Sequence, residues 1–295
     1  MKTPKYLSIL SLAVIGALYG ASPAWATPIL GADLSTFAIL GGAGVAVNGT
    51  GSVITGSVGG CCNAVAVTGY PARFTDSGGT VYVNPPFSTL PTATETAAQF
   101  ELGTAITALS GLGPVTPKAS LNGLTLGPGV YSIPATTLTG TLTLDGGGNA
   151  NALWVFLESS LLTTASSSNV IVQGTGAGAG VYWVTGSATL GSYSTFEGNI
   201  LANQSITLGT NVTDPCGRLL TQVASVTLAG TDTIGIGCSG ILTGSNGLSG
   251  GGTITNGVIT PLSFAPVPEP ETYAMLLAGL GLIGFTARRR KNLAA

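Results

Sequence analysis

The sequence predicts an all-β protein with one long helix, in which most strands stack as the coils of a β-solenoid. Three observations support this class. The 295 residues include 46 Gly and 40 Thr, and 44% are hydrophobic, a composition that favours short strands and tight turns. A strand-like motif recurs about every 20 residues, which is typical of stacked coils. A single stretch has helical rather than strand periodicity.

The repeat is a Ser followed by alternating apolar and Thr positions. Its three copies cover residues 187–190, 205–208 and 225–228, at spacings of 18 and 20. A weaker copy lies at residues 162–166, and residues 138–144 show the same alternation. Successive side chains of a strand point to opposite faces, so the apolar positions are predicted to point inward. These positions are Ala188, Leu190, Ile206, Leu208, Val226 and Leu228.

The remaining positions of the repeat predict a surface of hydroxyl groups. If the coils stack in register, equivalent residues lie about 4.8 Å apart on neighbouring strands. The outward Thr residues then form a ladder, and the Ser residues mark the turns where each strand begins. The predicted surface consists of Thr189, Thr207, Thr227, Ser187, Ser205 and Ser225. The alternative is that outward Thr simply suits a β-surface, because β-branched residues have high strand propensity.

The helix is predicted at residues 92–110. Thr92 and Glu95 have the spacing of a capping box, and Gly111 stands where a C-cap belongs. One apolar face recurs at helical spacing, and we expect it to pack against the rest of the domain. This face comprises Ala98, Leu102, Ala105, Ile106 and Leu109.

The N-terminal residues 1–26 predict a secretory signal peptide. Lys2 and Lys5 precede an apolar run over residues 7–18, and Ala24-Trp25-Ala26 is a small-x-small cleavage site. An N-terminal membrane anchor is the alternative, but the apolar run is short for one. We therefore expect export, with the working domain at residues 27–245 and a Gly/Pro linker at residues 246–266.

Residues 267–295 predict a C-terminal sorting tail. Pro268-Glu269-Pro270 is followed by a short apolar, transmembrane-type stretch at 273–287 and by the basic cluster at 288–291. This order resembles the PEP-CTERM sorting signal of Gram-negative bacteria. The resemblance implies processing by an exosortase, transient contact with the membrane, and release into or attachment to the cell envelope and its exopolysaccharide. An ordinary tail anchor is the alternative.

Charge and residue types exclude several functions. Between residues 27 and 266 nine acidic and three basic residues give a net charge of about −6, which offers no footprint for nucleic acid. The chain has no His, so it lacks His-dependent catalysis and His-ligated zinc, and we expect no catalytic, metal or cofactor site. Five acids are interpreted as scattered and solvated, which makes a polysaccharide-processing enzyme the weakest alternative. They are Asp145, Glu158, Glu197, Asp214 and Asp232.

Four cysteines in an exported chain predict disulfides. Cys216 and Cys238 are 22 residues apart, about one coil, and are expected to pair across neighbouring turns. The partners of Cys61 and Cys62 stay open. The aromatic residues Trp154, Phe156, Tyr182 and Trp183 lie in apolar strand runs and are predicted to be core residues.

Several stretches together resemble the bacterial and fungal ice-binding-protein-like family. They are residues 33–40, 124–131, 138–144, 152–156 and 194–202. The resemblance covers most of residues 27–234 and implies an irregular right-handed β-solenoid of triangular section with an α-helix packed alongside. The family's flat Thr/Ser/Asn face has no strict motif, so the ladder residues are inferred from the repeat and not carried over.

The resemblance and the ladder together predict an exported ice-binding protein. It would adsorb to ice through a flat Thr/Ser face and act as an antifreeze or an inhibitor of ice recrystallisation. The alternative is a structural or adhesive protein of the cell envelope or exopolysaccharide matrix without ice activity, because a fold does not fix a function.

Overall fold

The computed structural model describes residues 27–61, 67–83, 92–135, 137–255 and 258–262. The chain separates into two compact units, residues 1–262 and 263–295, and the described residues all belong to the first. Within these ranges no helix is long and apolar enough to cross a membrane. The predicted signal peptide, sorting motif and apolar tail stretch lie outside the described residues.

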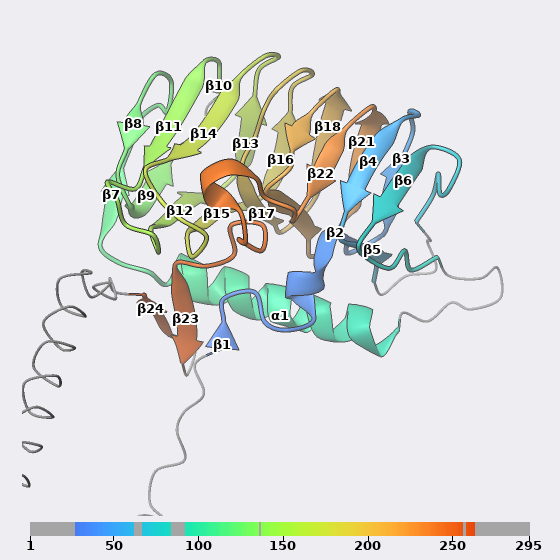
Figure 1. Cartoon of the computed structure of the whole chain (residues 1–295), viewed down its shortest axis with the longest axis horizontal. Coiled ribbons are helices and arrows are strands. Elements are labelled where there is room, and N and C mark those ends of the chain that lie inside the picture. The colour runs from blue at the N-terminus through green and yellow to red at the C-terminus, as the bar shows by residue number, and fades with distance from the viewer. Residues whose placement is uncertain (1–26, 62–66, 84–91, 136, 256–257, 263–295) are drawn as a thin grey trace, which may run out of the picture. The chain divides into compact units, whose positions relative to one another are not determined.

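Three sides of parallel strands form the first unit (Figure 1). One side, the helix-side sheet, has eight strands. In spatial order they are β5 (Ser57–Gly60), β2 (Phe37–Gly41), β20 (Gly217–Thr221), β17 (Gly198–Ala202), β15 (Gly180–Thr185), β12 (Leu153–Glu158), β9 (Gly129–Ile133) and β7 (Val115–Pro117).

The second side, the ladder sheet, contains the predicted repeat. Its six strands are β10 (Thr137–Leu138), β13 (Leu161–Thr164), β16 (Ser187–Leu190), β18 (Ile206–Thr210), β21 (Val226–Gly230) and β3 (Val45–Val47). The third side is divided. It consists of β14 (Asn169–Gln173), β11 (Thr141–Asp145) and β8 (Thr125–Leu126), then β19 (Thr213–Asp214), β22 (Thr233–Gly235), β4 (Ser52–Thr55) and β6 (Phe74–Ser77). The predicted β-solenoid is confirmed.

The interior of the solenoid is filled by apolar side chains from all three sides. Four aromatic rings follow one another across the coils. Tyr131 stacks on Phe156 at 5.5 Å between centroids and Phe156 on Trp183 at 4.0 Å, and Phe196 contacts Trp183 at 5.0 Å in a tilted arrangement. Trp154 and Tyr182 are also fully buried. The predicted aromatic core is confirmed, and such stacked pairs add to the stabilisation from area burial.

The helix α1 (Ala93–Ser110) begins and ends where the sequence predicts. Thr92 is its N-cap, and a capping box links the Thr92 hydroxyl to the Glu95 amide and the Glu95 carboxylate to the Thr92 amide. All five predicted apolar positions are buried. They pack with the outer face of the helix-side sheet, where Val155, Tyr182 and Leu201 belong to the same apolar cluster.

The order of the coils departs from chain order. The N-terminal strands β2, β3 and β4 pair with β20, β21 and β22 from the end of the solenoid, for example Ile39 with Leu219. Figure 1 shows α1 running along the solenoid from the end that holds β5 to the end that holds β7. The N-terminal strands therefore form one end of the solenoid, and α1 carries the chain to the other end. The later coils then stack back toward the N-terminal strands and pair with them.

Residues 246–262 do not form the predicted linker where the structure describes them. β23 (Gly252–Thr255) pairs antiparallel with β24 (Val258–Pro261) and with β1 (Thr27–Pro28). Leu248 is fully buried, and its carbonyl accepts a hydrogen bond from the Val181 amide. The Gly residues here serve close packing and not flexibility, because a Cβ on Gly250 would lie 2.2 Å from the carbonyl oxygen of Gly178.

Candidate functional site

The ladder sheet aligns Thr residues on five consecutive coils. Strand register pairs Thr137 with Thr163, Thr163 with Thr189, Thr189 with Thr207 and Thr207 with Thr227. Beyond Thr227 the row continues through Ala46 to Thr68. The sequence analysis missed Thr137, Thr163 and Thr68, although the partial copy at residues 162–166 carried the signal for Thr163.

The alternation along each strand separates the ladder from the core. Thr189 and Thr207 are exposed, and Thr163 and Thr227 are half-buried. Their strand neighbours are at most 3% exposed, and these are Leu162, Ala188, Leu190, Ile206, Leu208, Val226 and Leu228. The predicted inward positions are confirmed, and the Thr side chains point away from the core.

Small residues flank the ladder on both sides. Ala188, Ile206 and Val226 are register partners, so the Ser residues that precede them are also aligned. These half-buried residues, Ser187, Ser205 and Ser225, form a second row beside the ladder. On the other side, two places after each Thr, stand Ala165, Gly191, Gly209 and Ala229. No residue of these rows is charged. Leu161, the register partner of Ser187, is the one large exposed side chain in these rows, and the other positions present hydroxyl groups and small apolar groups.

The third side carries a less regular row of polar residues. Strand pairs and isolated bridges align Thr141, Asn169, Thr195, Thr213, Thr233, Val53 and Thr75. Val53 and the nearby Ile171 are each 43% exposed, so large apolar side chains interrupt the hydroxyl groups. The sheet itself breaks between β14 and β19. The ladder sheet is therefore the more uniform of the two uncovered sides.

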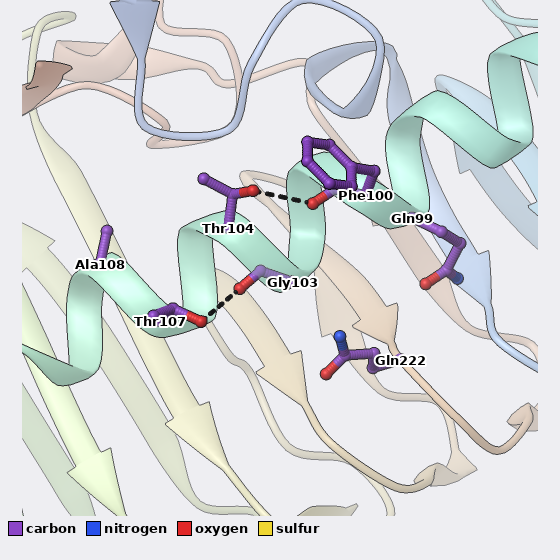
Figure 2. A pocket seen from close by; sticks show the side chains of 7 residues that line it. All are labelled: Gln99, Phe100, Gly103, Thr104, Thr107, Ala108 and Gln222. Atoms are coloured by element: carbon purple, nitrogen blue, oxygen red, sulfur yellow. Dashed lines mark hydrogen bonds between the residues drawn. The ribbon is translucent and has the colours of Figure 1, made fainter. Parts of the chain in front are cut away.

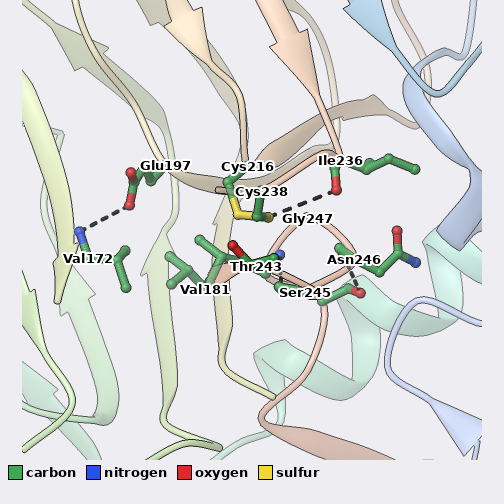
Figure 3. Close-up of a disulfide and its surroundings, with 12 residues drawn as sticks. Val172, Val181, Glu197, Cys216, Ile236, Cys238, Thr243, Ser245, Asn246 and Gly247 are labelled. Carbon is green, nitrogen blue, oxygen red and sulfur yellow. Dashed lines mark hydrogen bonds between the residues drawn. A yellow bond between two sulfur atoms is a disulfide. The ribbon is translucent and has the colours of Figure 1, made fainter. Parts of the chain in front are cut away.

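A disulfide joins Cys216 to Cys238, with their Cα atoms 4.7 Å apart (Figure 3). This is the predicted pair, and it ties β20 to the segment that follows β22. The same view shows Asn246 and Gly247 of the C-terminal segment close to this bond. Cys61 is also disulfide-bonded. Cys62 lies outside the described residues.

Four of the five acids are not solvated, which corrects the sequence analysis. Asp214 and Asp232 are fully buried, Glu158 is 6% exposed and Glu197 is half-buried. The fold buries these side chains wholly or in part, a feature that scattered acidic positions in a sequence do not reveal. Asp145 is the exception: it ends β11, and its carboxylate accepts a hydrogen bond from the Gly147 amide in the turn that follows.

Burial controls the protonation of these acids. Desolvation raises the pKa of Glu197 to about 7, although the Val172 amide donates a hydrogen bond to its carboxylate (Figure 3). Desolvation, and then the negative charge of Glu197, raise the pKa of Asp214 well above its ordinary value. Among the described residues neither carboxyl oxygen of Asp214 has a hydrogen-bond partner of good geometry, although the nearby amides of Gly198 and Cys216 act to lower its pKa. Glu197 and Asp214 are therefore still protonated over part of the pH range in which surface carboxylates are ionised.

We expect the protein to be more stable at pH 5 than at pH 8. The pKa of Glu197 is raised in the folded state, so its contribution is fully present below about pH 4.5 and is lost as the pH rises through about 7. The melting temperature should fall by about 5 °C over that window. Calorimetry of wild type and Glu197→Gln checks this: the variant should show a smaller fall, and an equal fall in both proteins would contradict the assignment to Glu197.

Arg218 is fully buried and joins three parts of the chain. Its Nη1 donates to Asn199 Oδ1 at 2.8 Å and to the carbonyls of Asn246 and Gly247 at 3.0 and 3.1 Å. Its Nη2 donates to the carbonyl of Ser35 at 2.7 Å. Desolvation lowers the pKa of Arg218 to about 10. The guanidinium group thus remains charged at neutral pH and links β17, the N-terminal segment and the C-terminal segment.

A shallow cavity of about 450 Å³ lies beside α1 (Figure 2). Phe100, Thr104 and Thr107 of the helix line it together with Gln222 from the loop after β20. Thr104 and Thr107 donate their hydroxyl hydrogens to helix carbonyls. The lining contains no ionisable group. Among the described residues no group of three or more Cys, Asp or Glu is placed to hold a metal ion.

Comparison with known proteins identifies two segments. Residues 39–234 match the family model of ice-binding-like proteins, and residues 266–291 match the PEP-CTERM protein-sorting motif. The second match includes Pro268, Glu269 and Pro270. It implies export, as the sequence analysis predicts.

Individual relatives agree with the family match. An ice-binding protein from Nostoc sp. is 36% identical over 294 residues, covering 97% of this chain and 96% of that protein. The crystal structure of an ice-binding protein from Antarctomyces psychrotrophicus is similar with a TM-score of 0.62 and 33% identity, covering 73% of this chain and all of the other. One from an Antarctic biological consortium has a TM-score of 0.60 and 28% identity, covering 71% and 91%. The chain belongs to the ice-binding-like family.

Proposed function

We propose that the protein binds ice and that the ladder sheet is the surface that adsorbs to the crystal. The observation that carries the proposal is the in-register row of Thr137, Thr163, Thr189, Thr207 and Thr227 on consecutive coils. Relatives named as ice-binding proteins support the activity. The choice of sheet rests on the geometry of this chain.

The physical basis is a match between a regular surface and a lattice. Neighbouring strands lie about 4.8 Å apart, so the Thr hydroxyls repeat at that interval and can occupy oxygen positions of ordered water. The Thr methyl groups and the flanking Gly and Ala residues have no charge to hold a liquid-like hydration shell. Because the core of the solenoid is closely packed, the Thr row keeps its spacing in the free protein. Adsorption to ice therefore costs little conformational entropy.

We propose that the mature protein acts outside the cytoplasm of a Gram-negative bacterium. Residues 1–26 would be removed as a signal peptide. The motif at Pro268-Glu269-Pro270 would be processed by an exosortase-type enzyme after transient membrane contact of the stretch at 273–287. The PEP-CTERM match supports this route. Release from the cell and attachment to the envelope or exopolysaccharide are both compatible with it.

A catalytic role finds less support. Hydrolysis of a glycosidic bond needs two carboxyl groups on either side of a substrate cleft. Glu197 and Asp214 are the close acidic pair among the described residues, and Asp214 is fully buried beneath the surface. We therefore favour a binding protein. A purely structural or adhesive protein of the matrix would need no uniform hydroxyl row, which is why it comes second.

The test is ice-recrystallisation inhibition by the purified mature chain, with the shape of single ice crystals recorded in the same samples. We expect inhibition and faceting at micromolar protein. The same protein after heat unfolding serves as control, because it keeps the composition but loses the spacing of the row. A folded, β-rich sample that leaves ice growth unchanged would exclude ice binding and favour the matrix alternative.

A further inference from the structure

A cavity of about 410 Å³ lies at the corner between the helix-side sheet and the ladder sheet, close to the end of α1. We call it the corner pocket. Leu157 and Val184 form an apolar part of its wall. Besides Glu158, its polar lining comes from Ser110, Ser132, Ser159, Thr185 and Asn203. The volume lies within the range of about 300–1,000 Å³ that is usual for small-molecule sites.

Glu158 lines the corner pocket and is 6% exposed. Its Oε1 accepts a hydrogen bond from the Leu161 amide at 3.0 Å and so completes the turn into β13. Its Oε2 is buried and has no hydrogen-bond partner in the part of the chain that the structure describes. A buried polar atom without a hydrogen-bond partner lowers the folding stability by about 1–3 kcal/mol. A ligand that supplies a hydrogen bond to this oxygen would remove that cost.

The next residue position on the neighbouring coil satisfies its polar side chain within the chain. Thr185 lies one coil on from Glu158, and its hydroxyl accepts from the Leu162 amide and donates to the Ser187 carbonyl. The Thr185 hydroxyl therefore has partners within the chain, whereas one carboxyl oxygen of Glu158 has none among the described residues. The second carboxyl oxygen of Glu158 is not used in the hydrogen bond to Leu161, and Glu158 is one of the residues that line the pocket.

We propose that the corner pocket binds one pyranose unit of a carbohydrate. Sugar hydroxyls both donate and accept hydrogen bonds, as do the Ser hydroxyls and the Asn203 amide around them. The C–H face of the ring would pack on Leu157 and Val184. No Lys, Arg or second carboxyl group lines the pocket, so its chemistry suits a neutral polyhydroxylated ligand. Desolvation raises the pKa of Glu158 to about 7, so its carboxyl group serves as donor or acceptor near neutral pH.

The test is saturation-transfer NMR of the mature chain with methyl glycosides of glucose, mannose and galactose. A concentration of about 20 mM fills even a site with a Kd of about 1 mM. We expect saturation transfer to at least one glycoside. Glu158→Gln keeps an acceptor for the Leu161 amide but replaces Oε2 by a donor, and should weaken binding about tenfold. Ser159→Trp places a large side chain at an exposed position of the rim and should abolish binding.

The outcomes separate this site from the ice-binding surface. Thr207→Tyr should bind the glycoside as wild type does, and Glu158→Gln should keep wild-type activity toward ice. Circular dichroism spectra equal to wild type show that each variant is folded. The proposal is overturned if no glycoside gives saturation transfer, because the pocket then holds only water. It is equally overturned if either pocket variant binds the glycosides as wild type does. Ethanolamine, a small cation, is the control ligand, and its binding in place of the glycosides would also overturn the proposal.

Discussion

Thr207→Tyr is expected to remove most of the ice-growth inhibition and to leave the melting temperature within about 3 °C of wild type. Thr207 lies in the middle of the ladder, with Thr189 and Thr227 as its register partners. A Tyr ring there stands above the flanking Ser and Gly rows and holds the sheet away from the crystal. Because Thr207 is exposed, the change creates no cavity in the core.

The matched control is Thr233→Tyr. Thr233 is equally an exposed Thr in a strand, but it belongs to β22 on the third side. We expect recrystallisation inhibition and crystal faceting close to wild type in this control. The reverse result, with activity lost in Thr233→Tyr and kept in Thr207→Tyr, would move the ice-binding surface to the third side.

Arg218→Ala is expected to cost about 3–5 kcal/mol of folding free energy, the range found when one partner is removed from a buried charged network. The variant leaves the carbonyls of Ser35, Asn246 and Gly247 without their charged donor and opens a cavity. For a domain of this size, such a loss lowers the melting temperature by roughly 10 °C. Differential scanning calorimetry measures it.

Arg73→Ala provides the comparison for Arg218→Ala. Arg73 is exposed and donates a hydrogen bond to the carbonyl of Asn48, so its loss should change stability by less than about 0.5 kcal/mol. Equal melting temperatures for Arg218→Ala and Arg73→Ala would show that the buried network contributes nothing. Arg218→Lys should be intermediate, because one ammonium group cannot reach the acceptors of both Nη1 and Nη2.

The coil structure follows from local patterns in the sequence, which is why it could be predicted. The alternation of Ala188, Thr189 and Leu190, repeated at Ile206 to Leu208, fixes which side of each strand faces the core. The helix was equally readable, because Thr92 and Glu95 form a local cap whose geometry needs no distant partner.

Features that depend on distant partners could not be predicted. Nothing in the local sequence of β2 shows that it pairs with β20, some 180 residues later. The Gly residues after Asn246 look like those of a flexible linker, and only the neighbouring backbone of Gly178 explains them. The acids Glu197 and Asp214 appear as isolated charges until the coils bring them together.

The return path of the chain along α1 has a consequence for the order of folding. Most solenoids grow coil by coil from one end, because each coil contacts only its neighbours. Here β20 is flanked by β17 from the preceding coil and by β2 from the beginning of the domain. The N-terminal coils pair with one another through β2–β5 and β4–β6, but they join the rest of the solenoid only when the last coil has formed, which requires closure of a loop of about 180 residues. The pairing of β2 with β20 therefore completes the domain late in folding. A cut in the chain between β2 and β20 would remove the covalent connection that keeps these two strands close to each other.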